Sequence, residues 1–97
     1  MIERTDGALR VSAPMVIANA RTLLEAGRAL LIAGPSANSE LLELAAVQEV
    51  DSSALSVVFA WLRVAAQRGV TLRIAHPPAS LLSLATLYGV SELLPLA

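Results

Sequence analysis

The stretch at residues 50–55, VDSSAL, constrains the fold most, because it marks the start of a helix that is apolar on more than one side. Asp51, Ser52 and Ser53 are residue types that cap helices, and an apolar pattern at helical spacing follows them at once. The pattern predicts a helix over residues 53–67, with Gly69 ending it. A single apolar stripe does not account for this helix, so a second side must also be covered.

Two sets of apolar residues lie on different sides of the predicted helix. The set expected to face the core is Leu55, Val58, Phe59, Leu62 and Ala66. The second set is Ala54, Val57, Trp61 and Val64. Either the helix is wedged between a sheet and a neighbouring helix, or the second set is a partner-binding face anchored by Trp61, since buried Trp residues often dominate interface energies. The sequence leaves both interpretations open.

The start of this helix is also a candidate binding site. A helix N-terminus carries unpaired backbone N–H groups and the positive end of the helix dipole. A phosphate, a nucleotide or a partner's carboxylate can be held there, beside the hydroxyls of Ser52 and Ser53. The simpler interpretation is that the two serines only cap the helix.

Four short segments have strand character. Asp-Gly at residues 6–7 separates residues 2–5 from residues 8–12, which predicts a tight antiparallel hairpin. Residues 70–75 are rich in β-branched side chains and predict a strand. Residues 41–44 are also interpreted as a strand, although Leu favours helix, because the run is short, bounded by turn residues and placed between two helices.

Two further helices complete the pattern. Pro14 is expected in the first turn of the first helix, where its missing N–H does no harm, and Gly34 ends that helix. Gly27 weakens it by up to ~1 kcal/mol relative to Ala, and is expected to let another backbone come close. Residues 79–88 form a short apolar helix, and residues 90–96 pack as a tail.

The predicted order is therefore ββαβαβα. A strand, a helix and a second parallel strand cross over with right-handed connectivity, so we expect an α/β fold with a small mixed four-stranded sheet and three to four helices. Ninety-seven residues suffice for one core, and residues 1–97 are predicted to form a single domain.

Composition narrows the possible partners. The hydrophobic fraction is 56%, above the usual share of about 45–50%, so part of the apolar surface should lie against a partner, or against a second copy in a homodimer. The chain has seven Arg, no Lys and eight acidic residues. Because positive charge is not in excess, we do not expect binding to nucleic acid. The N-terminus is charged from its third residue, unlike a signal peptide, and no apolar run approaches the roughly 18 residues that span a bilayer. We expect a cytoplasmic protein whose link to any membrane is made only through a partner.

The residues that enzymes use are sparse. The chain has no Cys and no Lys, and its one His, His76, lies in a turn. A nucleophilic Ser needs a base and a group to orient that base, and neither is apparent near Ser52. There is no glycine-rich phosphate loop and no metal-spaced cluster. We therefore expect no enzyme activity, no cofactor and no metal.

With a strand before it and an apolar helix after it, the motif at residues 50–55 resembles that of STAS domains, the module of sulfate transporters and anti-sigma factor antagonists. The resemblance covers nearly the whole chain, from the hairpin through the first helix to residues 87–90, LYGV. It implies the STAS fold and supports a strand at residues 41–44.

Two branches of this family imply different partners. In anti-sigma factor antagonists, the hydroxyl after the Asp is phosphorylated by a partner serine kinase, and the phosphate breaks the complex; that position matches Ser52. The cytoplasmic STAS subunit of the Mla phospholipid transporter instead binds the ABC ATPase, and through it the membrane permease. It supports assembly and activity of a complex that maintains outer-membrane lipid asymmetry. There the position of Ser52, with Asp51 and Ser53 beside it, belongs to the ATPase-facing surface.

Several residues favour the transporter branch. Residues 12–15, SAPM, and residues 84–90, LATLYGV, resemble that subunit, as does the short ending after Leu94-Pro95. Antagonists usually have Gly where this chain has Ala54, which weakens the phosphorylation hypothesis. A third hypothesis is a module that binds a nucleotide or a lipid: the helix start permits an anion, but nothing in the sequence supplies a pocket that reads a base.

Overall fold

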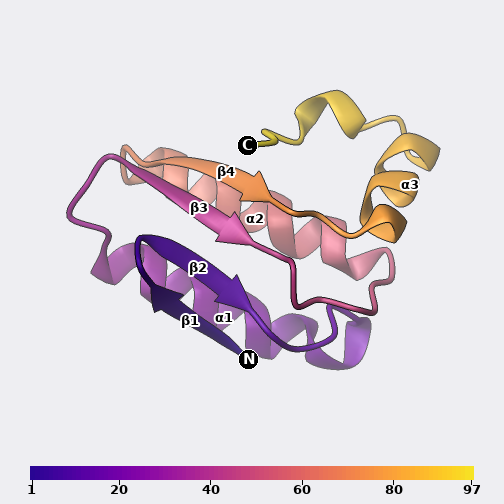
Figure 1. The fold of residues 1–97 in the computed structure, drawn as a ribbon, viewed down its shortest axis with the longest axis horizontal. Coiled ribbons are helices and arrows are strands. Elements are labelled where there is room, and N and C mark those ends of the chain that lie inside the picture. Colours follow the sequence, from indigo (N-terminus) through magenta and orange to yellow (C-terminus); the bar gives the residue numbers. More distant parts are fainter.

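A mixed four-stranded sheet and three helices make up the computed structural model, which describes residues 1–97 (Figure 1). The strands lie in the sequence order β1-β2-β3-β4, with β1 antiparallel to β2 and the other pairs parallel. Their bounds are β1 Ile2–Thr5, β2 Ala8–Val11, β3 Ser39–Glu43 and β4 Thr71–Ala75. The helices are α1 Ile17–Ala33, α2 Ser53–Gln67 and α3 Ala79–Leu87, followed by a short 3-10 turn, η1, at Ser91–Leu93. The predicted α/β class and the order ββαβαβα are confirmed.

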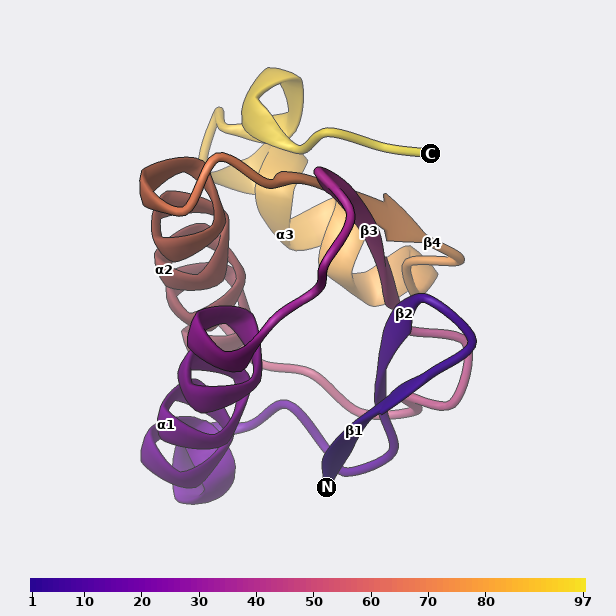
Figure 2. The same cartoon turned by 90° about the vertical axis from the view of Figure 1, so that its left-hand side faces the viewer.

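Helices α1 and α2 cover one face of the sheet. Figure 2 shows them side by side on that face, while α3 lies farther from the viewer, and Figure 1 shows α3 beyond the end of β4. Both helices return the chain from the end of one parallel strand to the start of the next, so α1 and α2 run in the same direction. No helix in the chain is long and apolar enough to span a bilayer.

The two edge strands of the sheet are β4 and β1, and a further segment of the chain lies along β4. The tail after η1 lies along β4, where the Ile74 N–H donates to the Pro95 carbonyl and the Ala97 N–H donates to the Ile74 carbonyl, each at 2.8 Å. The other edge strand, β1, turns into β2 through Asp6 and Gly7, whose φ angles of 49° and 78° fit the predicted turn.

The first helix starts later than predicted. It begins at Ile17, because Met15 is held in an extended bridge to Val50. The Met15 N–H donates to the Glu49 carbonyl at 2.9 Å, and the Asp51 N–H donates to the Met15 carbonyl at 3.1 Å. A contact with a segment more than thirty residues away therefore overrides the local helix signal of Pro14.

The second apolar set on α2 faces inward rather than toward solvent, which favours the wedged helix over the partner-binding face among the two interpretations that the sequence leaves open. Ala54, Val57 and Trp61 are buried, and Val64 is half-buried. The Trp61 indole N–H donates to the Leu24 carbonyl at 3.2 Å. Helix α2 is thus wedged between the sheet and a neighbouring helix, and Trp61 is part of the core rather than an anchor for a partner.

Gly27 is the residue that makes room for Trp61. A Cβ atom at position 27 would lie 2.7 Å from Cζ2 of the indole and closer still to its neighbouring ring atoms, so any larger residue overlaps the ring. The predicted close approach at Gly27 therefore exists, but a side chain rather than a backbone makes it.

The partly buried ion pair between Arg4 and Glu40 joins the sheet to α1. Arg4 Nε donates to Glu40 Oε2 at 2.7 Å, and Nη2 donates to Oε1 at 3.1 Å and to the Leu30 carbonyl at 2.8 Å. The Glu40 side chain is fully buried, and its hydrogen bond raises the pKa of Arg4 above the ordinary value. One side chain of β1 thus contacts both β3 and α1.

Replacing Gly27 with Ala should destabilise the protein by about 1–2 kcal/mol, because the overlap with Trp61 outweighs the gain in helix propensity. Urea unfolding followed by circular dichroism measures the change. In a Trp61→Leu background the cost of Gly27→Ala should fall close to zero or become a gain. An equal cost in both backgrounds would contradict this account of the contact.

Candidate partner-binding site

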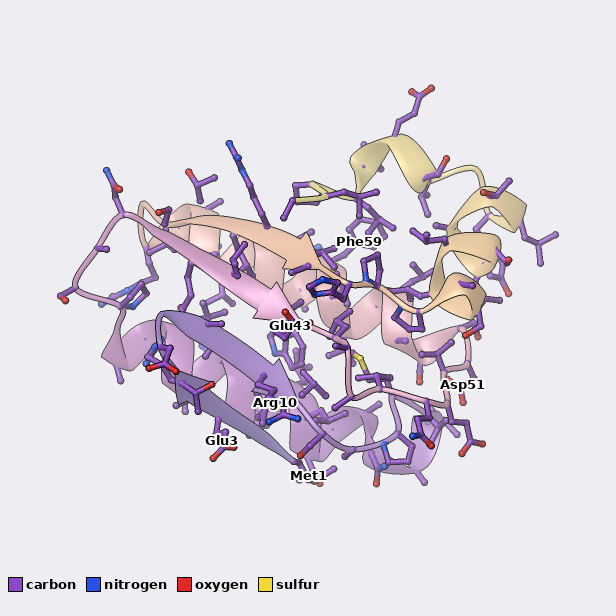
Figure 3. The ribbon with its side chains drawn as sticks, viewed as in Figure 1. Met1, Glu3, Arg10, Glu43, Asp51 and Phe59 are labelled. Carbon is purple, nitrogen blue, oxygen red and sulfur yellow. The ribbon has the colours of Figure 1, made fainter.

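The carboxylate of Asp51 holds the starts of two helices. Its Oδ2 accepts a hydrogen bond from the N–H of Ile17, the first residue of α1, at 2.9 Å. Its Oδ1 accepts from the N–H of Ser53, the first residue of α2, at 2.9 Å, and from the Ser53 hydroxyl. Figure 3 shows Asp51 where the two segments meet. One side chain therefore satisfies N–H groups that would otherwise lack partners at both helix starts.

The charge of Asp51 suits this position. The positive ends of both helix dipoles point toward it. The hydrogen bond from the Ser53 hydroxyl, followed by that from the Ile17 N–H, holds the pKa of Asp51 below its ordinary range. The carboxylate is thus kept ionised by the donors that it caps.

Ser52 does not cap the helix, which corrects the simpler interpretation of this serine. Its backbone is already helical, with φ −61° and ψ −23°, and its side chain makes no capping hydrogen bond. Ser53 is half-buried and donates its hydroxyl to Asp51, whereas Ser52 is exposed. Of the two serines, only Ser52 offers a hydroxyl that the fold does not use.

A groove of about 520 Å³ opens beside Ser52. It runs from the start of α1 across the first half of α2 to the end of α3. Its lining residues are Ile17, Ser52, Ser53, Leu55, Ser56, Phe59, Tyr88 and Val90. The apolar side chains on its rim are unusually open to solvent, since Ile17 is 75% exposed and Tyr88 is 57% exposed. Leu87, at the end of α3, and Leu93, in η1, are also largely exposed.

Sequence reasoning missed most of this groove. Periodicity places Phe59 in the core stripe, and Phe59 does pack against the core, but it also lines the groove. No binding role is predicted for Tyr88, which lines the groove as well. The signal that could have located them was the excess of apolar residues, because some of that surface had to remain uncovered in a chain this short. Helical periodicity alone does not say which apolar side meets a neighbouring helix.

The other titratable groups do not join this site. His76 pairs with Glu43 at the end of the sheet, with Nδ1 3.0 Å from each carboxylate oxygen. Burial alone raises the pKa of Glu43, but the hydrogen bonds from His76 and from the Ala45 N–H outweigh it and lower the pKa. No group of three or more His, Cys, Asp or Glu side chains is placed to hold a metal ion. Around Ser52 the arrangement offers a surface for binding, with both oxygens of Asp51 committed to Ile17 and Ser53.

Removing the charge of Asp51 should make stability less dependent on pH in the acidic range. Because the pKa of Asp51 is lowered on folding, its stabilising effect is fully present above the unfolded value of about 3.9 and is lost as the pH falls through the folded value. Asp51→Asn should therefore lower the melting temperature at pH 7, and the difference from the parent protein should shrink below pH 4. Thermal denaturation across this range measures it. Glu49→Gln, an exposed neighbour, is the control, and an equal loss at every pH would contradict the capping role.

Comparison with solved structures identifies the fold. A Thermotoga maritima protein assigned as an anti-sigma factor antagonist superposes with a TM-score of 0.76 at 18% identity, covering 99% of this chain and 83% of the other. A sulfate transporter family protein from Wolinella succinogenes has a TM-score of 0.68 at 16% identity, with 90% and 69% covered. The phosphorylated form of the Bacillus cell fate determinant SpoIIAA has a TM-score of 0.69 at 11% identity, with 100% and 89% covered. At these identities the likeness shows the fold alone, which is the predicted STAS fold.

A sequence search finds no matching curated protein. A family model described as "Mlab, STAS domain" matches residues 2–95, nearly the full length of the chain. STAS domains are in general regulatory or binding modules without catalytic activity, and membership implies a protein partner. The chain therefore belongs to the STAS domain family, in its Mlab type.

Proposed function

We propose that this chain is the cytoplasmic STAS subunit of a phospholipid-transporting ABC complex. In this role it binds the ATPase subunit, reaches the membrane permease through it, and supports the assembly and activity of a complex that maintains outer-membrane lipid asymmetry. The observation that carries the proposal is the match of residues 2–95 to the Mlab type of STAS domain.

The groove beside Ser52 is the surface that we assign to the ATPase. It combines an unused hydroxyl at a helix start with apolar side chains that remain open to solvent, notably Ile17 and Tyr88. Covering such side chains is favourable by about 25 cal/mol for each Å² of apolar surface removed from water. An apolar side chain of the ATPase would occupy the groove, and a small polar group would meet Ser52.

Asp51 takes part in this surface indirectly. Its hydrogen bonds to Ile17 and Ser53 fix the starts of α1 and α2 relative to each other, and these starts form one wall of the groove. The remaining predicted residues, Ala54, Val57, Trp61 and Val64, support the same wall from inside by packing α2 against α1.

A second candidate is an anti-sigma factor antagonist that a serine kinase switches at Ser52. Two similar structures favour it, since one is assigned as an anti-sigma factor antagonist and another is a cell fate determinant in its phosphorylated form. The exposed hydroxyl of Ser52 is accessible to a kinase. A phosphate would add about 1.5 to 2 negative charges beside Asp51, and a partner surface that excludes water would disfavour them.

Ser52→Glu separates binding from folding. The added charge lies in the groove, so we expect at least tenfold weaker binding to the ABC ATPase, with the melting temperature nearly unchanged because Ser52 makes no side-chain contact that the fold needs. Co-expression with the ATPase, affinity purification and titration by biolayer interferometry measure the change. Ser80→Glu is the matched control, an exposed serine in the first turn of α3.

The outcomes distinguish the candidates. Recovery of the ATPase with the parent protein, reduced by Ser52→Glu and not by Ser80→Glu, supports the transporter subunit and its groove. Unchanged affinity of both variants would indicate that the interface with the ATPase lies elsewhere on the molecule. Failure to bind the ATPase, together with phosphorylation of Ser52 by an anti-sigma serine kinase, would favour the antagonist.

A further inference from the structure

A second hollow lies at the opposite end of the sheet from Ser52, and the strand starts that line it are on the left in Figure 1. It has a volume of about 420 Å³ and forms where the β1–β2 turn, the start of β3 and the start of β4 come together. Its lining residues are Gly7, Asn38, Ser39, Glu40, Leu41, Thr71 and Arg73. Only one of the seven is apolar, in contrast to the groove beside Ser52.

The polar side chains around this hollow are mostly uncommitted. The amide of Asn38, the hydroxyls of Ser39 and Thr71 and the guanidinium of Arg73 make no hydrogen bond or ion pair within the chain. All four can donate hydrogen bonds. Donors from β3, β4 and the loop before β3 therefore line one space.

The charge balance of the hollow is positive. Its only carboxylate is that of Glu40, and both oxygens of Glu40 already accept hydrogen bonds from Arg4, at 2.7 and 3.1 Å. The charge of Glu40 is thereby offset from within the fold. The charge that remains without a partner is that of Arg73.

Arg10 provides a contrast on the same open face of the sheet. Its neighbours across the two adjacent strands are Glu3 and Glu43, and Figure 3 labels all three residues. The cross-strand neighbour of Arg73 is Leu41. Of these two arginines, only Arg73 has no acidic residue directly opposite it, and the next acidic residue along β3, Glu43, is paired with His76.

We propose that this hollow binds a small oxyanion, a phosphate or a carboxylate group, through Arg73 and the hydroxyls of Ser39 and Thr71. A guanidinium presents paired donors that match two oxygens of such a group, and hydrogen bonds to a charged acceptor are about twice as strong as neutral ones. Asn38 donates from the loop side. The site is independent of the ATPase surface, so occupation of one does not require the other.

Titration followed by ¹⁵N nuclear magnetic resonance tests this proposal on the full chain. Sodium phosphate and sodium acetate are added separately at constant ionic strength, with sodium chloride as the reference salt. We expect saturable shifts of the Gly7, Leu41 and Thr71 amides with at least one oxyanion and none with chloride. The oxyanion that binds tells whether the site accepts a phosphate or a carboxylate group.

Variants locate the binding. Arg73→Gln should weaken the oxyanion at least about tenfold, and Thr71→Val, which keeps the shape of the side chain, should weaken it about threefold. Arg10→Gln is the control and should leave the affinity unchanged. Shifts that are equal with chloride, or an equal loss in the Arg10 and Arg73 variants, would overturn the proposal, because both results indicate general screening of surface charge.

Discussion

The carboxylate of Asp51 is the interaction on which the arrangement of the helices depends. Because α1 and α2 run in the same direction on one face of the sheet, their positive ends come together, and an anion placed between them is favoured by both. The same segment also bridges back to the chain before α1, where Met15 pairs with Val50. Ser52 follows Asp51 directly in the sequence. Because the Asp51 carboxylate caps both helices, the Ser52 side chain is not needed as a cap and remains exposed. The exposed hydroxyl is thus a consequence of which residue holds the helix starts.

The two helices are held a second time, deep in the layer, by Trp61. Its ring fills the space that Gly27 leaves open, and its N–H satisfies the Leu24 carbonyl. The polar contact at the helix starts and the apolar contact lower down act on the same pair of helices. Together they hold the wall of the groove in one arrangement. Less conformational entropy is then lost when a partner binds there.

Much of the fold follows from local sequence signals, and the features that the sequence does not predict share one physical cause. The bounds of α2 and the Asp6-Gly7 turn are readable because caps, periodicity and positive φ act within a few residues. The start of α1, the capping role of Asp51 and the side of α2 that faces solvent depend on contacts across more than thirty residues, such as that of Met15 with Val50. In the candidate site, Asp51, Ser52 and Ser53 were found from their motif. The groove was not, because Tyr88 comes to it from a distant helix.

The position of Trp61 makes its fluorescence an intrinsic probe of how α1 and α2 pack. It is the only Trp in the sequence, it is fully buried between α1 and α2, and it does not line the groove beside Ser52. Its intrinsic fluorescence therefore responds to the spacing of the two helices and not to direct contact with a ligand in the groove. A partner that binds without moving the helices leaves the emission spectrum unchanged. A partner that separates the helices lets water reach the indole, and the emission shifts to longer wavelength. A single unlabelled spectrum thus separates rigid docking from a rearrangement of the helical layer.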